Sequence, residues 1–318
     1  MTGLIENLKK AAKGRPRRVI FPEQNDPRII DAALQLKRLG LAEPIILATE
    51  NADEGQLEIF AEQPNHRKLF KSAVAHLVKL RAHKGMTPPE AENALQNPLL
   101  LAAVLVSIGY ADAGIAGSIA TTAEVLRAGI QGIGLSPDAG LVSSFFLMEL
   151  KDGRVLTFAD CAVIPTPDSE QLAEIAIKSA ASHQRITQQA PCTALLSFST
   201  RGSAAHASVD KVRSALTIAR QKQPTLNIDG ELQFDAAFVP EIASRKAADS
   251  NVAGKANVYI FPNLEAGNIA YKIAERLGEA KAIGPLLQGL AKPWMDLSRG
   301  CSSEDIVNVA VIASLLAR

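Results

Sequence analysis

The sequence alternates short, almost continuously apolar segments with longer amphipathic ones along nearly its entire length. The apolar segments span residues 18–22, 44–48, 113–116, 194–198 and 258–261. Each is followed by a polar loop that contains glycine or proline, and then by a stretch with helical periodicity. Strands that are apolar at every position are typical of a parallel sheet with helices on both of its faces. The sequence therefore predicts an α/β fold built on parallel sheets.

A change of pattern between residues 132 and 153 indicates a second domain. Glycines become frequent there, and the apolar segments 145–150 and 154–158 flank Lys151-Asp-Gly153, which is typical of a β-hairpin. We expect a discontinuous first domain, residues 1–138 plus 286–318, and a second domain, residues 139–285.

Composition excludes several classes of protein. With 34 Lys and Arg against 33 Asp and Glu, the net charge is +1, so the chain has no global field for nucleic acid or an anionic membrane. The three cysteines are too few and too far apart for a disulfide framework, which suits a reducing cytosol. The first residues lack the apolar stretch of a signal peptide, and the longest apolar runs, 99–106 and 306–316, are too short to span a membrane. We therefore expect a soluble, cytoplasmic protein.

The common catalytic fingerprints are absent from the sequence. It contains no G-x-x-x-x-G-K-[ST], no G-x-G-x-x-G, no H-E-x-x-H and no G-x-S-x-G. The five histidines form no pair with the spacing of metal ligands. These absences disfavour triphosphate-hydrolysing enzymes, metalloenzymes and serine hydrolases.

The segment from Lys292 to Ile306 carries the strongest chemical signal. Ser298, Arg299 and Gly300 precede an apolar helix, so a guanidinium, backbone N–H groups and the positive helix end are expected to converge on an anion of the size of phosphate. Asp305 falls in the first turn of that helix. On the pattern alone, Ser302-x-x-Asp305 favours a capping box over a catalytic base.

Two further loops are candidates for the same anion. Ser199 and Thr200 follow one predicted strand, and Ser118 and Thr121 follow another. Ligands of parallel sheets gather at the carboxyl ends of strands, so we expect these hydroxyl groups to contribute to a phosphate site formed by several loops. Three basic side chains are expected to add positive charge at its rim: Arg81, Lys84 and Arg127.

Five long motifs resemble phosphate acetyltransferase (phosphotransacetylase). They are residues 116–123, 196–203, 229–238, 256–269 and 296–308, which occur in the family's order, and the resemblance extends over essentially the whole chain. Two other stretches, 125–129 and 143–148, are most similar to the short, ethanolamine-utilisation type of the family.

The resemblance implies the reversible reaction of acetyl-CoA with phosphate to give acetyl phosphate and CoA. It implies two αβα domains of the isocitrate and isopropylmalate dehydrogenase type, an active site in the cleft between them, and a homodimer. Transfer is direct, within a ternary complex, and needs no metal or cofactor beyond CoA as a substrate. The implied site residues are Asp305 as the base for the CoA thiol, Ser298 and Arg299 at the reacting acyl phosphate, and Arg81 and Arg127 at CoA.

One position departs from the family, and several readings remain open. Many members have Asn where this chain has Met295, so the acyl-chain preference is less defined than the reaction. A propionyl or butyryl transferase is a close variant, and a non-catalytic acetyl-CoA sensor belongs to another class. A nicotinamide-dependent dehydrogenase is disfavoured because no matching set of metal-binding aspartates is present.

Overall fold

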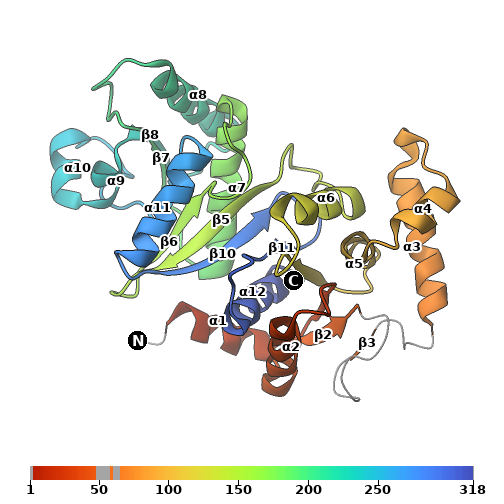
Figure 1. Ribbon diagram of the computed structural model, residues 1–318. Coiled ribbons are helices and arrows are strands. Elements are labelled where there is room, and N and C mark those ends of the chain that lie inside the picture. Colours follow the sequence, from red (N-terminus) through yellow and green to blue (C-terminus); the bar gives the residue numbers. More distant parts are fainter. Residues whose placement is uncertain (1–2, 48–57, 60–64, 318) are drawn as a thin grey trace. The chain divides into compact units, whose positions relative to one another are not determined.

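The computed structural model describes residues 3–47, 58–59 and 65–317 (Figure 1). Ala48, at the end of the second predicted strand, lies outside these residues. The chain divides into two compact units. The first unit comprises residues 4–138 and 290–318, and the second comprises residues 139–289 together with Gly3.

A parallel sheet forms the centre of the first unit. In the described residues its strand order is β11-β4-β1-β2-β3, and all four pairings are parallel. The strands are β1 (Arg18–Phe21), β2 (Glu43–Ile46), β3 (Glu58–Ile59), β4 (Ala113–Ala116) and β11 (Trp294–Asp296). The strands predicted at the start of the chain and at 113–116 are thereby confirmed.

Helices cover this sheet and connect its strands (Figure 1). They are α1 (Leu4–Lys13), α2 (Pro27–Leu39), α3 (His66–Leu80), the 3₁₀ turn η2 (Ala82–Lys84), α4 (Pro88–Ala94), α5 (Pro98–Ser107), α6 (Thr122–Gly132) and α12 (Ser303–Leu316). The helix α2 begins with a local pattern typical of helix starts, in which Asp26 is the N-cap and Pro27 occupies the first helical position. It ends at Gly40, whose φ of 64° lies in the left-handed region that glycine adopts without strain.

The two longest apolar runs are core helices of the first unit. Every residue from Leu99 to Val106 in α5 is buried, and so are most residues of α12 after its first turn. Both helices pack against β1 and β4, and α12 also packs against α1 and α2. A helix that is apolar on all sides needs to be covered on all sides, and these packing partners provide that cover.

Trp294 fixes the edge strand β11 against its neighbours. Its side chain is 1% exposed and its Nε1–H donates a hydrogen bond to the carbonyl oxygen of Val125 in α6 at 3.0 Å. Gly114 of β4 and Gly129 of α6 lie against the indole ring, where a Cβ atom would clash with it. The absence of side chains at these two positions therefore allows β11 to lie beside β4.

The second unit contains a six-stranded sheet of mixed direction. Its order is β10-β5-β6-β9-β7-β8, in which the β10–β5 and β5–β6 pairings are antiparallel and the remaining pairings are parallel. The strands are β5 (Ser143–Glu149), β6 (Val155–Ala159), β7 (Thr193–Leu196), β8 (Ile228–Leu232), β9 (Val258–Ile260) and β10 (Lys281–Gln288). The predicted hairpin is β5–β6, and because a tight turn joins strands only in antiparallel fashion, this sheet is parallel in part rather than throughout.

The helices of the second unit follow its strands along the chain. They are α7 (Ser169–Thr187), α8 (Ala207–Lys222), α9 (Phe234–Phe238), α10 (Pro240–Lys246) and α11 (Leu264–Arg276). Aromatic rings pack in the core, with Phe158 5.6 Å from Tyr259 and 5.2 Å from Phe261 between ring centres. Both units are therefore α/β in architecture.

Candidate active site

Three polar loops of the first unit meet at one edge of its sheet. Glu23 follows β1, residues 117–121 follow β4, and residues 297–302 follow β11. The three strands are neighbours and run parallel, so their carboxyl ends lie at the same edge. Open parallel sheets bind their ligands at this edge, and it forms the candidate site.

The carboxylate of Glu23 fills the turn that follows β4. Its Oε2 accepts hydrogen bonds from the N–H groups of Gly117 at 2.7 Å and Ser118 at 2.9 Å, and from the Ser118 hydroxyl at 3.0 Å. Its Oε1 accepts from the N–H groups of Ile119 at 3.0 Å and Ala120 at 2.7 Å. The turn is an anion cradle, as its composition predicts, but the anion that it holds is a carboxylate of the chain itself.

The two hydroxyl groups predicted in this turn have partners within the chain. Ser118 is 3% exposed and its hydroxyl is bound to Glu23. Thr121 is exposed and caps α6: its hydroxyl donates to Glu124 Oε2 at 2.8 Å and accepts from the Glu124 N–H at 3.3 Å. Their contact with phosphate stays a prediction, and a bound phosphate has to compete with these internal bonds.

Arg28 connects the turn after β4 to the loop after β11. Its Nη2 donates to the carbonyl oxygen of Ser118 at 2.9 Å, and its Nη1 donates to the carbonyl oxygens of Arg299 at 2.9 Å and Cys301 at 2.7 Å. Its Nε and Nη2 also bind the carboxylate of Asp26, at 3.0 and 2.7 Å. These side-chain hydrogen bonds lower the pKa of Asp26 and raise the pKa of Arg28. One guanidinium thus holds both loops in place.

The segment from Ser298 to Asp305 forms a turn followed by a capped helix. The carbonyl oxygen of Ser298 accepts from the Cys301 N–H at 2.9 Å, and its hydroxyl oxygen accepts from the Gly300 N–H at 3.3 Å. Asp305 Oδ2 accepts from both the N–H and the hydroxyl of Ser302, each at 2.8 Å, and the Asp305 N–H donates to Ser302 Oγ at 3.2 Å. The predicted capping box is confirmed.

Two charged side chains of this segment have groups that bind no other described residue. Within the described part of the chain, the guanidinium of Arg299 has no hydrogen-bond or ion-pair partner, and neither has Oδ1 of Asp305. Both side chains are exposed. Because the cap uses only Oδ2, the same carboxylate can cap α12 and still offer an oxygen to a proton.

Cys301 lies between these two residues, yet its chemistry is that of a buried thiol. It is 7% exposed, and burial raises its pKa to about 11, with the charge of Arg28 opposing the rise. A thiol with so high a pKa is a poor nucleophile near neutral pH. Cys301 therefore has a packing role.

Asp296, the last residue of β11, is a buried acid beside the same loops. It is 1% exposed, and within the described residues neither of its carboxylate oxygens has a hydrogen bond of good geometry. Burial raises its pKa to about 6, the charge of Glu23 adds to the rise, and the nearby Thr122 hydroxyl opposes it. Gly117 lies against this carboxylate, where a Cβ atom would clash with Oδ1.

A separate pocket of the first unit brings together the two arginines predicted to bind CoA. Arg81 at the end of α3 and Arg127 on α6 line a pocket of about 370 Å³, together with Lys84. Leu126 and Ile130 supply part of its apolar wall. Three cations beside an apolar wall suit a ligand that carries both phosphate groups and an apolar part.

In the second unit, Ser199 and Thr200 are buried in the loop after β7. The Ser199 hydroxyl donates to Glu231 at 2.9 Å. The Thr200 hydroxyl donates to the side chain of Gln233 at 3.3 Å and accepts from the Gln233 N–H at 2.9 Å. These hydroxyl groups thus hold their own loop, and their contact with phosphate stays a prediction.

Acidic residues of β8 anchor the same loop. Asp229 accepts from Arg201 at 2.8 Å, and Glu231 accepts from Arg213 at 2.8 Å and from the Gly202 N–H at 2.7 Å. Burial acts to raise the pKa of Glu231, but its hydrogen bonds outweigh burial and hold the pKa at about 2. The segment 229–238, which resembles the family, therefore stabilises the loop 199–203 through hydrogen bonds and ion pairs.

Three residues of the site edge were given no role from the sequence: Glu23 and Arg28 belong to no motif, and Asp296 opens the motif 296–308. Glu23, Arg28 and Asp296 act on backbone groups or acids that are distant in sequence, such as Gly117, 94 residues beyond Glu23. Glu23 and Asp296 have one detectable signal, a charged residue at or just after the carboxyl end of a buried strand. Such a position is a candidate for a site in a parallel sheet.

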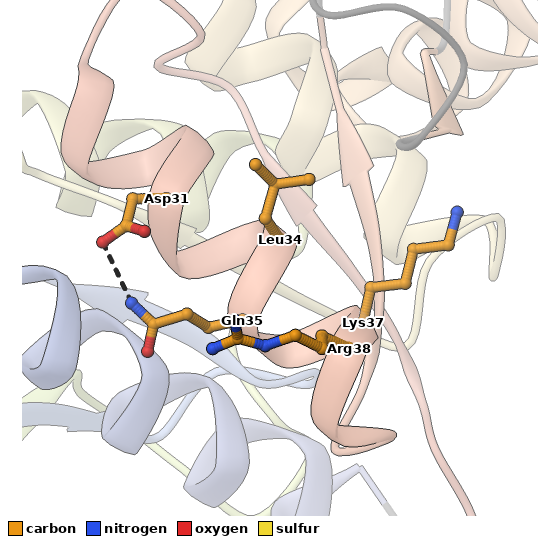
Figure 2. A pocket seen from close by; sticks show the side chains of 5 residues that line it. All are labelled: Asp31, Leu34, Gln35, Lys37 and Arg38. Carbon is orange, nitrogen blue, oxygen red and sulfur yellow. Dashed lines mark hydrogen bonds between the residues drawn. The ribbon is translucent and has the colours of Figure 1, made fainter.

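Another hollow lies on the outer face of α2, apart from the candidate site. Figure 2 shows its described lining, with Asp31, Leu34 and Lys37 among the side chains, and the hydrogen bond from Gln35 Nε2 to Asp31 Oδ2 at 2.9 Å. Its volume is about 570 Å³. None of its described lining residues is among the predicted site residues.

The described ranges lack two kinds of feature. No group of three or more His, Cys, Asp and Glu side chains is placed to hold a metal ion. No helix of this part of the chain has both the length and the apolar character required to cross a bilayer.

The fold and the edge loops define the first unit as an α/β domain with a candidate site at the carboxyl ends of its parallel strands. The sequence profile described as Phosphate acetyl/butaryl transferase matches residues 3–314. The chain is 44% identical to the phosphate acetyltransferase of Paracoccus denitrificans, over 98% of each chain. It therefore belongs to the phosphate acetyl/butaryl transferase family, which confirms the resemblance.

Solved structures agree with this assignment. A phosphotransacetylase from Streptococcus pyogenes aligns with a TM-score of 0.89 and 41% identity, covering 99% of this chain and 98% of the other. The EutD phosphotransacetylase from Staphylococcus aureus aligns with a TM-score of 0.89 and 39% identity over the same shares. The 4-hydroxythreonine-4-phosphate dehydrogenase from Klebsiella pneumoniae, at 11% identity and a TM-score of 0.51 (96% of this chain and 100% of the other), shares the fold alone, in keeping with the predicted dehydrogenase-like architecture.

Proposed function

We propose that the protein is a phosphate acetyltransferase, which transfers an acetyl group reversibly between CoA and phosphate. CoA and acetyl phosphate are its substrates in one direction, acetyl-CoA and phosphate in the other. The observation that carries the proposal is the pair of open groups on one anchored segment: the guanidinium of Arg299 and Oδ1 of Asp305 have no partners among the described residues.

In the direction of acetyl-CoA synthesis, Asp305 takes the proton of the CoA thiol. A free thiol has a pKa near 8.5, so a carboxylate within hydrogen-bond reach raises the share of reactive thiolate during attack. The sulfur attacks the carbonyl carbon of acetyl phosphate, and the carbonyl oxygen becomes an oxyanion. The C–S bond is then complete, the bond from carbon to the phosphate oxygen breaks, and phosphate leaves with the electron pair.

Ser298 and Arg299 act on the other side of the reacting carbon. The Ser298 hydroxyl donates to the developing oxyanion, and one such donor contributes on the order of 10²–10³ in rate. Arg299 binds the phosphoryl oxygens and accompanies the leaving phosphate. Ser118, Thr121, Ser199 and Thr200 are further candidates for phosphate contact. No protein nucleophile, metal or cofactor other than CoA enters these steps.

CoA is held by the cation pocket of the first unit, Arg81, Lys84 and Arg127. Its volume of about 370 Å³ and its mixture of cations with apolar side chains support this role. The nucleotide end of CoA carries several negative charges. The three cationic side chains can pair with them through charge-assisted hydrogen bonds.

The test of the proposed function is the release of free thiol from acetyl-CoA by the purified protein. We expect release that depends on phosphate and that ceases when phosphate is omitted. Tight binding of acetyl-CoA without turnover would instead identify a sensor. Comparison of acetyl-, propionyl- and butyryl-CoA determines the acyl preference, since Met295 occupies a position where many relatives have Asn.

The protein acts as a cytoplasmic homodimer, and α11 supplies a face for a second copy. Ile269, Ile273 and Leu277 are 58%, 52% and 81% exposed and recur at intervals of four residues, so they form one apolar stripe on this helix. Burial of such a stripe against its own symmetry mate is a common solution for a two-fold interface.

Light scattering during gel filtration tests the dimer. We expect twice the 33.8 kDa of one chain for the native protein, and one chain mass for Ile273→Glu combined with Leu277→Glu. Leu39→Glu, at an exposed leucine of the first unit, is the control and keeps the native mass. A single chain mass for the native protein excludes the dimer.

A further inference from the structure

Asp296 is a buried acid without a hydrogen-bond partner of good geometry among the described residues. It ends β11, and the turn that carries Ser298 and Arg299 begins two residues later. An ionised carboxylate in such a place loses much of its hydration, so the neutral acid is favoured more than in an exposed aspartate.

Glu23 provides a contrast at the same place. Its carboxylate accepts four backbone N–H bonds and one hydroxyl bond. Gly117 donates its N–H to Glu23 and lies against the carboxylate of Asp296. Two acids thus flank one glycine, and the backbone N–H groups of the turn 117–120 are directed to Glu23.

No neighbouring cation compensates Asp296 in the described structure. Burial is the largest influence on its pKa and raises it to about 6; the charge of Glu23 adds to this rise, and hydrogen bonds from Thr122 and the Leu297 backbone oppose it. The charged groups at the starts of the surrounding helices are bound to partners of their own: Asp26 to Arg28 on α2, Glu124 to Thr121 on α6, and Asp305 to Ser302 on α12.

We propose that Asp296 is a positioning residue that takes up a proton when phosphate or acetyl phosphate binds, so that Glu23 carries the single buried negative charge beside the bound anion. The proposal rests on the proposed function, which seats that anion at Arg299. The proton comes from solvent and is bound by a carboxylate oxygen of Asp296. Proton binding and anion binding then strengthen each other, because each removes repulsion that the other meets.

The coupling predicts how phosphate affinity depends on pH. Below pH 6 Asp296 is already neutral and phosphate binds without proton uptake at this residue. Above pH 6 the free protein has an ionised Asp296, and the binding of phosphate must be accompanied by its protonation. The KM for phosphate therefore rises with pH through this range, in addition to any change from phosphate ionisation.

The experiment compares the full-length protein with Asp296→Asn. We expect the ratio of the two KM values for phosphate, native over variant, to increase at least about fivefold between pH 5.5 and 7.5. Because both proteins meet the same phosphate species, this ratio removes the ionisation of phosphate itself. A ratio that is constant with pH overturns the proposal, whereas absence of phosphate-dependent turnover in the native protein overturns the proposed function instead.

A control variant separates Asp296 from a general charge effect. Glu304→Gln removes an exposed carboxylate in the first turn of α12, next to Asp305. We expect it to change the KM for phosphate by the same factor at every pH. If this variant reproduces the pH-dependent ratio of Asp296→Asn, the specific role of Asp296 is excluded.

A measurement on the native protein covers the case in which the variant does not fold. Carbon NMR of labelled aspartate carboxyl groups is expected to show one resonance that titrates near pH 6. Addition of inorganic phosphate is expected to move its midpoint to higher pH. A midpoint that does not respond to saturating phosphate contradicts the coupling.

Discussion

Arg28 donates a hydrogen bond from Nη1 to the carbonyl oxygen of Arg299 at 2.9 Å. The same guanidinium binds the carbonyl oxygen of Ser118 and the carboxylate of Asp26. Arg299 therefore has its backbone fixed from α2 while its own guanidinium points to no partner in the described residues. A charged side chain on an anchored backbone is prepared to bind an anion with little loss of conformational freedom.

Replacement of Arg28 by Lys is expected to lower kcat/KM by about 10²-fold, because small displacements of positioned groups have effects of that size. Lysine has a single ammonium group and cannot reach two loops and Asp26 together. Steady-state kinetics of thiol release measures the loss. Arg38→Ala, at the far end of the same helix, is the control and keeps native kinetics. Native kinetics for Arg28→Lys contradict the anchoring role.

Substitution of Asp305 is expected to distinguish its role as a helix cap from its role as a catalytic base. Asp305→Asn keeps an oxygen that can accept the bonds of Ser302, so the free energy of unfolding changes by less than about 1 kcal/mol. Loss of the carboxylate base lowers kcat by about 10²-fold or more. Denaturant unfolding and kcat are measured on the same preparation.

Ser302→Ala is the matched control for this prediction. It removes the hydroxyl of the capping box at a cost of about 1 kcal/mol while the Asp305 carboxylate remains. Its kcat is expected to stay near the native value. Should Asp305→Asn retain native turnover, Asp305 is a helix cap and nothing more.

Local features of this fold were predictable from sequence, and long-range ones were not. The N-cap at Asp26, the β5–β6 hairpin and the capping box at Ser302 depend on residues a few positions apart, and each is found where its pattern indicates. The Glu23 cradle joins residues 94 or more positions apart, and no local pattern encodes such a pairing.

The hydroxyl-rich loops show a second limit of sequence reasoning. Ser118 and Ser199 have the composition of phosphate loops, but their hydroxyls donate to Glu23 and Glu231. The amino-acid sequence alone does not distinguish a serine that binds a ligand from a serine that binds a buried carboxylate. Only the position of the acid, which tertiary packing decides, distinguishes them.

Arg299→Lys is expected to raise the KM for phosphate and for acetyl phosphate at least about tenfold. The planar guanidinium binds two phosphate oxygens in parallel, whereas an ammonium is a point charge. The KM for CoA, measured on the same variant, serves as the internal control and stays within about twofold of native. Equal effects on all substrates would indicate a general disturbance of the loop.

The cation pocket is expected to act on CoA binding alone. Lys84→Gln and Arg127→Gln each remove one charge from its lining, and we expect a rise of about tenfold in the KM for CoA with little change in kcat. The effect diminishes at high ionic strength because exposed charges are screened. Lys79→Gln, on α3 outside the pocket lining, is the control. A fall in kcat without a change in KM would contradict this role.

Asp296 is expected to make stability depend on pH in a definite direction. Its pKa is raised from 3.8 to about 6 in the folded protein. Between these values the folded chain holds a proton that the unfolded chain has lost, so the free energy of unfolding falls as pH rises from about 4 to about 6 and then levels off. A difference of about two pKa units corresponds to about 3 kcal/mol, as an upper estimate.

Asp296→Asn removes this dependence and isolates it from every other titrating group. The variant is expected to gain stability relative to the native protein as pH is raised from 4.5 to 7.5. Trp294, the single tryptophan of the chain, is 1% exposed and lies two residues from Asp296, so its fluorescence follows unfolding of the first unit. Urea titrations at the two pH values give the stability difference directly. An equal difference at both pH values means that Asp296 titrates alike in the folded and unfolded chain, in contradiction to its buried, unpartnered place.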